Sequence, residues 1–180
     1  MTPLAAYAVL DFETGGLDPH TCALCSVGVV FLDAELREVA RYHRTIADEP
    51  GKVYTDVAMA VNGLDLEELK ATGTPVAEIL EFLKRELAGK TVVCHNASFD
   101  LGFLRARGIE VPEAVCTLEL SRLRDPRERV HRLGVVAKRH QVECGPAHDA
   151  LGDVITTANV LRRFARDMGS VATKPRPVRF

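Results

Sequence analysis

Two carboxylates, Asp11 and Glu13, follow an apolar run at residues 7–10 that has the composition of a buried strand. Side chains two residues apart on a strand point to the same face, so both acids are expected at one edge of the core. Neighbouring anions repel each other and resist removal from water, and a divalent cation compensates them most directly. A solvated strand end before the turn at Gly15 and Gly16 would explain the pair without a metal.

Two further acids and a histidine favour the metal. Asp100 lies in the first turn of an expected helix, directly after an apolar strand at residues 91–94. Asp153 lies beside the apolar stripe of a long helix expected at residues 149–167, where an unpartnered carboxylate is costly. His148 comes just before that helix. Each has an ordinary explanation alone, because a helix dipole favours an early acid and most loop histidines are structural.

The set as a whole points to metal-dependent phosphoryl transfer. Four carboxylates around one site are untenable without cations, and two divalent ions, Mg²⁺ or Mn²⁺, would neutralise them. In phosphoryl-transfer enzymes such ions sit about 3.5–4 Å apart, where one activates water and the other stabilises the leaving oxygen. A histidine can accept the proton from that water. The candidate residues are Asp11, Glu13, Asp100, Asp153 and His148.

The elements that must position these residues follow from hydrophobic patterns and turn signals. Strands are expected at residues 7–10, 25–32, 38–46 and 91–94. The short links between the first three predict an antiparallel meander. Helices are expected at residues 66–69, 76–87, 99–107, 117–123, 130–140 and 149–167. Strands that then alternate with helices predict an α/β domain with a mixed central sheet flanked by helices, and residues 47–64 read as irregular.

Length and charge limit the other possibilities. The chain has 180 residues, 47% of them apolar, which suits a single domain, expected at residues 1–168. A net charge of −2 gives no global attraction to nucleic acid, so such a partner needs a local patch. No apolar span is long enough for a membrane helix, and the first seven residues lack a basic leader, so we expect a cytoplasmic protein. Residues 169–180, with three basic residues and two prolines, are expected to form a flexible tail.

The chain has five cysteines, and Cys22 and Cys25 form a lone CxxC pair. A structural zinc site needs four ligands, and no second pair completes this one. We therefore expect free thiols in a reducing compartment.

Three motifs, in order, give a specific resemblance over residues 7–164. The first is DFETGGLDP at residues 11–19, and the second is HNASFDLGFL at residues 95–104. The third is AHDALGDV at residues 147–154. They resemble the DxETTGLDP, HNAxFDxxFL and AHxAxxDA motifs of the DnaQ-like, or DEDDh, 3′–5′ exonucleases, and the HxxxxD spacing separates them from the DEDDy branch. One departure is Gly15, where the family commonly has a second threonine.

The resemblance implies a ribonuclease H-like fold. It also implies that Asp11, Glu13, Asp100 and Asp153 hold two divalent metal ions and that His148 is the general base. The residues that would contact or lie near the terminal nucleotide, with a hydrophobic side chain wedged against the last bases, are Thr14, Leu17, His95, Asn96 and Phe99.

The implied activity is hydrolysis of phosphodiester bonds from the 3′ end of single-stranded DNA, releasing nucleoside monophosphates, in a proofreading-type or stand-alone role. A DNA polymerase subunit is then an open possibility as a partner. Alternatives are an RNA-trimming exoribonuclease of the same family and a catalytically silent nucleic-acid-binding subunit of a polymerase complex. Residues 122–139 hold seven Lys or Arg against two acids, which suits either a phosphate-binding track or a solvated face.

Overall fold

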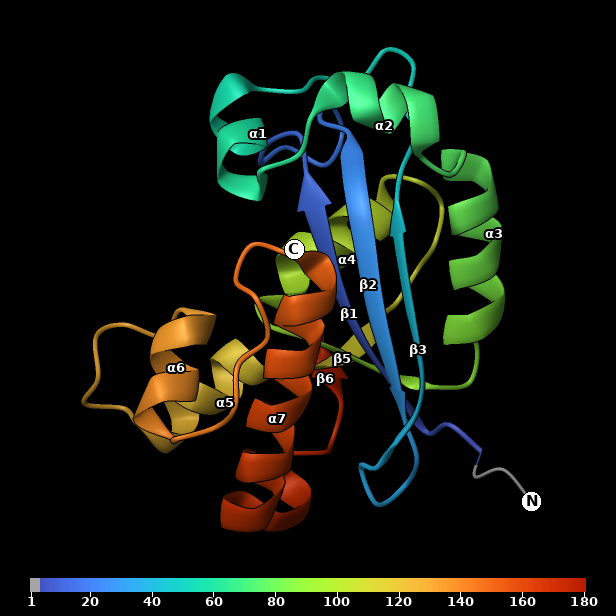
Figure 1. Ribbon diagram of the computed structural model, residues 1–180. Coiled ribbons are helices and arrows are strands. Elements are labelled where there is room, and N and C mark those ends of the chain that lie inside the picture. Colours follow the sequence, from blue (N-terminus) through green and yellow to red (C-terminus); the bar gives the residue numbers. More distant parts are fainter. Residues whose placement is uncertain (1–3) are drawn as a thin grey trace.

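A computed structural model describes residues 4–180. Residues 1–3 lie outside the described residues, and so do the parts of two expectations that fall on them, the domain at residues 1–168 and the absence of a basic leader. A six-stranded sheet with the strand order β3-β2-β1-β4-β5-β6 forms the centre of the molecule (Figure 1). Its strands are β1 (Tyr7–Thr14), β2 (Leu24–Leu32), β3 (Glu38–Thr45), β4 (Thr91–Cys94), β5 (Glu113–Cys116) and β6 (Arg176–Pro177).

The sheet is mixed, as expected. Strands β1, β2 and β3 pair antiparallel, which confirms the predicted meander. Strand β4 then pairs parallel with β1, and β5 pairs parallel with β4. The predicted α/β class with a ribonuclease H-like arrangement is confirmed.

Helices cover both faces of the sheet. They are α1 (Asp56–Asn62), α2 (Leu66–Thr72), α3 (Val76–Leu87), α4 (Ala97–Arg105), α5 (Thr117–Arg124), α6 (Leu133–Arg139) and α7 (Ala150–Met168), followed by the short 3-10 helix η1 (Gly169–Val171). Helices α3 and α4 pack on one face, and α5, α6 and α7 pack on the other. Helices α1 and α2 lie beyond the end of the meander (Figure 1). No helix within residues 4–180 has the length and apolar character needed to span a membrane.

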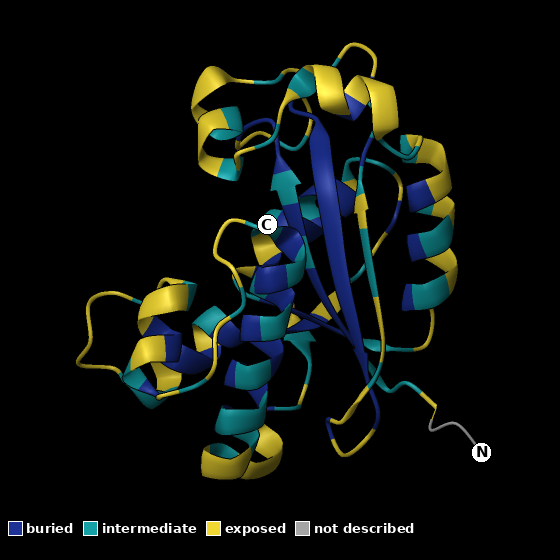
Figure 2. Ribbon diagram, in the orientation of Figure 1, coloured by how far each residue is buried: buried dark blue, intermediate teal, exposed yellow. Residues whose placement is uncertain are grey.

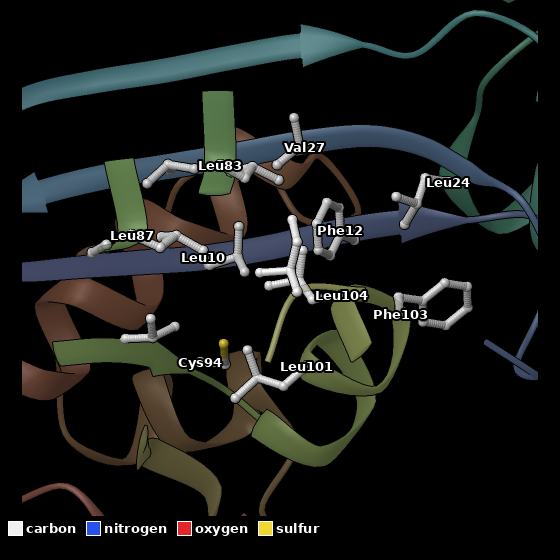
Figure 3. Close-up of a cluster of buried hydrophobic side chains, with 14 of the residues drawn as sticks. Leu10, Phe12, Leu24, Val27, Leu83, Leu87, Cys94, Leu101, Phe103 and Leu104 are labelled. Atoms are coloured by element: carbon white, nitrogen blue, oxygen red, sulfur yellow. The ribbon is translucent and has the colours of Figure 1, made fainter. Parts of the chain in front are cut away.

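Two hydrophobic cores result, one on each face, and β1 contributes to both. Leu10 and Phe12 pack with Leu83 and Leu104 beneath α3 and α4 (Figure 3). Val9 packs in the other core, with α7. Strand β2 is buried along its whole length because helices cover both of its faces (Figure 2). By the two-residue period of a strand, Asp11 and Glu13 share the face of Val9 and so face α7.

Gly28 lets α7 come close to the sheet. It pairs directly with Asp11 across β1 and β2. A Cβ atom on Gly28 would lie only 2.3 Å from the carbonyl oxygen of Ala150, in the first turn of α7. The absence of a side chain at Gly28 therefore allows the first turn of α7, with Asp153 in it, to pack beside Asp11.

Helix α1 and strand β5 were not predicted from the sequence. Residues 47–64, expected to be irregular, contain α1, which the Thr55 side chain caps at its start and Gly63 ends in a left-handed conformation. Its residues are not buried, so no core-facing pattern marks it. Strand β5 is only four residues long, too short for a clear period-two signal. Helix α4 also begins two residues earlier than expected, at Ala97.

The structure differs from the expectation of a flexible tail at residues 169–180. Ala172 is buried in the core next to α7, and β6 pairs antiparallel with β5. Beyond β6, the backbone N–H of Val178 donates to the carbonyl oxygen of Pro112 at 3.0 Å. Backbone pairing of this kind depends little on side-chain composition, so a basic, proline-containing segment gave no sign of it.

Candidate active site

Three carboxylates meet where β1 ends beside α7. One oxygen from each of Asp11, Glu13 and Asp153 lies within 4.8 Å of the others. Asp11 and Glu13 come from the same face of β1, and Asp153 comes from the first turn of α7, as the sequence predicted. Three carboxylates at this distance offer oxygen atoms that could hold a divalent cation.

Asp100 reaches the same region from α4. Its carboxylate is 1% exposed and accepts a hydrogen bond of 3.0 Å from the backbone N–H of Phe12. Asp100 is not among the three residues with oxygens within 4.8 Å of one another. Its charge nevertheless contributes to raising the pKa of Asp11, so the fourth acid acts on the same site.

The electrostatics show that these acids lack compensation. Burial, followed by the charges of Asp100, Asp153 and Glu13, raises the pKa of Asp11 well above its ordinary value. Burial and then Asp153 raise the pKa of Glu13 to about 7. Burial raises the pKa of Asp100 to about 8, although the N–H of Phe12 opposes this. The described protein groups thus do not neutralise these carboxylates, and hard divalent cations would do so.

His148 lies next to Asp153, one acid of this cluster. It precedes α7, is exposed and has a left-handed backbone with φ of 58°. Burial raises the pKa of Asp153, and both the charge and the backbone N–H of His148 oppose that rise, which places His148 next to the carboxylate. An exposed imidazole beside the acidic cluster suits a group that exchanges protons with water.

Asp149 begins α7 and adds a further negative charge. One of its oxygens accepts a hydrogen bond of 3.1 Å from the backbone N–H of Gly152, so Asp149 caps the start of the helix. Its other oxygen lies 3.6 Å from Nε2 of His43 on β3. The first turn of α7 is therefore fixed both by its own cap and by the outer strand of the meander.

A cavity of about 520 Å³ opens beside Glu13. Of the residues expected near the terminal nucleotide, Thr14, Leu17 and Phe99 line it. Leu17 is 84% exposed, so its side chain is free to contact a ligand in the cavity. The Thr14 hydroxyl donates to the carbonyl oxygen of Gly16 at 2.7 Å, so it also stabilises the turn.

Helix α1 forms the other wall of this cavity, and sequence reasoning missed it. Val57, Ala58, Val61 and Asn62 all line the cavity, with Val57 77% exposed. The Asn62 side chain donates to the carbonyl oxygen of Thr14 at 2.9 Å, tying α1 to the first motif. The signal that could have revealed α1 is the pair of valines four residues apart.

Gly15 explains the departure from the family motif. A Cβ atom there would lie 2.4 Å from the carbonyl oxygen of Val53. Its backbone N–H donates to Ala23, and its carbonyl oxygen accepts from Thr55, at 2.9 and 2.8 Å. The turn is therefore pinned from both sides, and a side chain at Gly15 would push away the segment that leads into α1.

His95 and Asn96, also expected near the terminal nucleotide, do not line the cavity beside Glu13. Nδ1 of His95 is 2.8 Å from the Thr117 hydroxyl, and Nε2 is 2.9 Å from the carbonyl oxygen of His131. Burial lowers the pKa of His95 to about 4, so the ring is neutral at pH 7. His95 does not line the cavity beside Glu13, whereas Asn96, with φ of 75°, lines an adjoining cavity.

A buried ion pair holds the loop that follows the meander. Arg107 donates to both carboxylate oxygens of Glu49, at 3.0 and 2.7 Å. The same guanidinium donates to the carbonyl oxygens of Pro19 and Cys22, and Glu49 accepts from the N–H of Leu24. This network fixes the turn between β1 and β2, which carries Leu17.

The five cysteines are free, as expected. Cys22 and Cys25 are both buried. Burial raises the pKa of Cys25 to about 12, so its thiol is inert at neutral pH.

Comparisons with known proteins show the family to which the chain belongs. A family model described as an exonuclease, RNase_T, matches residues 8–161. The PolC-type DNA polymerase III of Listeria monocytogenes is 28% identical over 170 residues, covering 91% of this chain and 11% of the polymerase. The chain thus spans about a tenth of the length of that curated relative.

Solved structures show the same fold at low identity. E. coli Exonuclease I in complex with a dA16 oligonucleotide superposes with a TM-score of 0.80 at 15% identity, covering 94% of this chain and 42% of that one. Exonuclease X in complex with 5′ overhanging duplex DNA superposes with a TM-score of 0.73 at 23% identity, covering 91% of this chain and 93% of that one.

Proposed function

Because the chain belongs to the DnaQ-like 3′–5′ exonuclease family, we propose that it is a metal-dependent nuclease that removes nucleotides from the 3′ end of single-stranded DNA. The observation that carries the proposal is the meeting of Asp11, Glu13 and Asp153 within 4.8 Å beside an apolar cavity. A site for divalent cations and a site for a nucleobase are then adjacent, as removal of a terminal nucleotide requires.

The donor set fits two divalent metal ions, Mg²⁺ or Mn²⁺. All four acids offer hard carboxylate oxygens, and burial, together with the charges of neighbouring acids, raises the pKa values of Asp11, Glu13 and Asp100. We assign Asp11, Glu13, Asp100 and Asp153 as the residues that would hold them. Bound there, the ions would activate a water molecule and stabilise the leaving oxygen.

The chain's own residues supply the remaining functions. His148, exposed beside Asp153, accepts the proton of the attacking water. Leu17, Phe99 and the valines of α1 hold the terminal base by apolar contact. His95 has both ring nitrogens engaged, so we assign it to positioning the second motif rather than to contacting substrate.

The preference for DNA and for a polymerase partner rests on relatives. The PolC-type relative is a DNA polymerase, and the Exonuclease I structure contains a dA16 oligonucleotide. We therefore propose single-stranded DNA as substrate, in a proofreading-type or stand-alone role. An association with a DNA polymerase subunit is part of the same proposal for the proofreading role.

The test is a cleavage assay with Mg²⁺ or Mn²⁺ on 5′-labelled and 3′-labelled DNA and RNA of one sequence. Stepwise shortening of the 5′-labelled strand, with the 3′ label released as a mononucleotide, is expected on DNA. The Asp11→Ala protein serves as the control and should be inactive, because it lacks a ligand at the centre of the cluster.

Each other outcome has a distinct meaning. Faster shortening of RNA would retain the chemistry and replace DNA by RNA as substrate. Equal activity of the Asp11→Ala protein would contradict the metal-ligand assignment. Binding of both strands without cleavage by the unmodified protein would favour a silent binding subunit.

A further inference from the structure

The segment at residues 176–180, called the tail segment below, lies outside the range matched by the family model. Its strand β6 pairs with β5 through Glu113 and Ala114. Backbone hydrogen bonds therefore fix the tail segment on the edge of the sheet, largely independently of its side chains. Those side chains include Arg176, Arg179 and Phe180.

The tail segment completes a basic cleft of about 200 Å³. Arg176 and Arg179 line it from the tail segment, and Arg122 lines it from α5. Within residues 4–180, none of the three guanidinium groups makes an ion pair, and Glu119 is the one acid that lines the cleft. Three guanidinium groups facing one carboxylate leave a net positive site, which suits an anionic ligand.

This cleft is linked to the candidate active site by neighbouring cavities that share lining residues. It shares Asn96 and Ser98 with a cavity of about 510 Å³. That cavity in turn shares Leu17 and Phe99 with the cavity beside Glu13. One path therefore runs from the acidic cluster, past the exposed leucine, to the arginines.

Phe180 lies in the middle of this path. Its side chain is 56% exposed and lines the 510 Å³ cavity. The guanidinium carbon of Arg105 lies 4.7 Å from the centre of the Phe180 ring. An exposed aromatic ring beside arginines is the combination that binds single-stranded nucleic acid, through base stacking and phosphate contacts.

We propose that the tail segment and Arg122 form the outer part of the nucleic-acid groove. Phosphates of the substrate strand, on the 5′ side of the nucleotides held at Leu17, are bound by Arg122, Arg176 and Arg179. Phe180 stacks on a base that lies between these phosphates and Leu17. The inference rests on the proposed function and adds a longer binding site to it. A strand is favoured over a free phosphate because the cleft continues into the cavity that would hold its 3′ end.

The test compares three proteins, each also carrying Asp11→Ala so that bound DNA is not cleaved. One is otherwise unchanged, one carries Arg176→Ala with Arg179→Ala, and one carries Arg127→Ala with Arg129→Ala as the matched control. Arg127 and Arg129 are exposed and line none of the three cavities. Fluorescence anisotropy measures binding of a thymidine dinucleotide and a long oligothymidylate over a range of salt concentrations, and melting temperatures verify folding.

The tail double variant should bind the long oligothymidylate about tenfold more weakly, with a salt slope shallower by about 1.4, since each lost single-strand phosphate contact removes about 0.7. Dinucleotide binding should be unchanged, and the control should resemble the parent. In a fourth protein, Phe180→Ala together with Asp11→Ala should weaken binding of the long strand without changing the salt slope. Equal affinity and slope for the tail variant and the parent would overturn the proposal, as would an equal loss in the arginine control.

A second measurement separates this inference from the proposed function. Proteins with Asp11 intact are tested on the p-nitrophenyl ester of thymidine 5′-monophosphate, which reaches only the acidic cluster. Failure of the unmodified protein to hydrolyse the ester would count against the proposed function, while the binding data would still test the groove. Loss of ester hydrolysis in the tail variant would show damage to the catalytic centre and would contradict an outer binding site.

Discussion

The backbone N–H of Phe12 donates a hydrogen bond of 3.0 Å to the carboxylate of Asp100, across a sequence separation of 88 residues. This contact joins β1 to α4 at the level of Asp11 and Glu13. The parallel pairing of β1 with β4 ends at Val9, so it does not use the backbone N–H of Phe12. One oxygen of Asp100 accepts from this N–H instead. Asp100 is therefore both a candidate ligand and part of the fold.

Asp100→Asn should separate these two roles. The amide oxygen can still accept from Phe12, while the buried negative charge is removed. We expect an unfolding temperature in EDTA equal to or above that of the parent, and cleavage reduced at least 100-fold. Asp100→Ala, which also leaves the N–H of Phe12 unpaired, should be less stable than Asp100→Asn by about 1–3 kcal/mol. Near-normal cleavage by Asp100→Asn would contradict its assignment as a ligand.

The metal-free protein should lose stability as the pH rises from 6.5 to 8. The pKa values of Glu13 and Asp100 are about 7 and 8 in the fold, above the ordinary values of 4.5 and 3.8. The folded state then binds more protons than the unfolded state, so the free energy of unfolding falls with rising pH in this window. Below pH 6.5 the lowered pKa of His95, about 4, has the opposite effect.

Chemical denaturation in EDTA should show a loss of about 1–2 kcal/mol over this window, after allowance for solvent screening at the partly exposed Glu13. Saturating Mg²⁺ should largely abolish the loss, because the bound cation takes over the compensation of the acids. Glu13→Gln with Asp100→Asn is the control and should flatten the EDTA curve. An unchanged slope in that variant would contradict the pKa assignment.

His148→Ala should slow cleavage about 10²–10⁴-fold, the usual contribution of a positioned general base. Stabilisation by Mg²⁺, measured as the rise in melting temperature, should be retained, because His148 is not among the clustered carboxylates. Loss of the Mg²⁺ stabilisation would instead make His148 a ligand.

Gly28→Ala should impair activity through geometry alone. The added methyl group meets the carbonyl oxygen of Ala150 at 2.3 Å, and this is backbone that must move. Displacement of the first turn of α7 would move Asp153 away from Asp11, so metal-induced stabilisation should weaken along with the rate. Gly134→Ala, where a Cβ atom has nothing within 4 Å, is the matched control and should retain activity. Full activity in Gly28→Ala would show that the close approach is not required.

The sequence predicted where the clustered acids lie, because local rules fix their placement. A period of two places Asp11 and Glu13 on one face, and an apolar helix stripe places Asp153 toward the sheet. The wall formed by Val57 and Val61 was missed, since exposed valines on a short helix do not follow a core pattern. The role of Gly28 required knowing where Ala150 lies, which no local pattern encodes.

The tail differed from its prediction for a related reason. Strand β6 has two residues, and its position comes from backbone pairing with Glu113 and Ala114. The amino-acid composition of a segment indicates whether its side chains favour burial or a given secondary structure. It does not indicate whether another strand offers an unpaired edge. The basic, proline-containing character of residues 169–180 therefore suggested disorder, although an edge of β5 was free to receive it.

The placement of Asp153 on α7 also sets the order in which the site can be assembled. Asp11 and Glu13 lie in the first strand, whereas α7 begins at Ala150. During synthesis, the two early acids leave the ribosome long before the helix that completes their cluster. Contacts between such distant parts of a chain form slowly. A nascent chain that has folded only its meander therefore carries Asp11 and Glu13 without Asp153. The complete acidic cluster forms only when α7 packs onto the sheet.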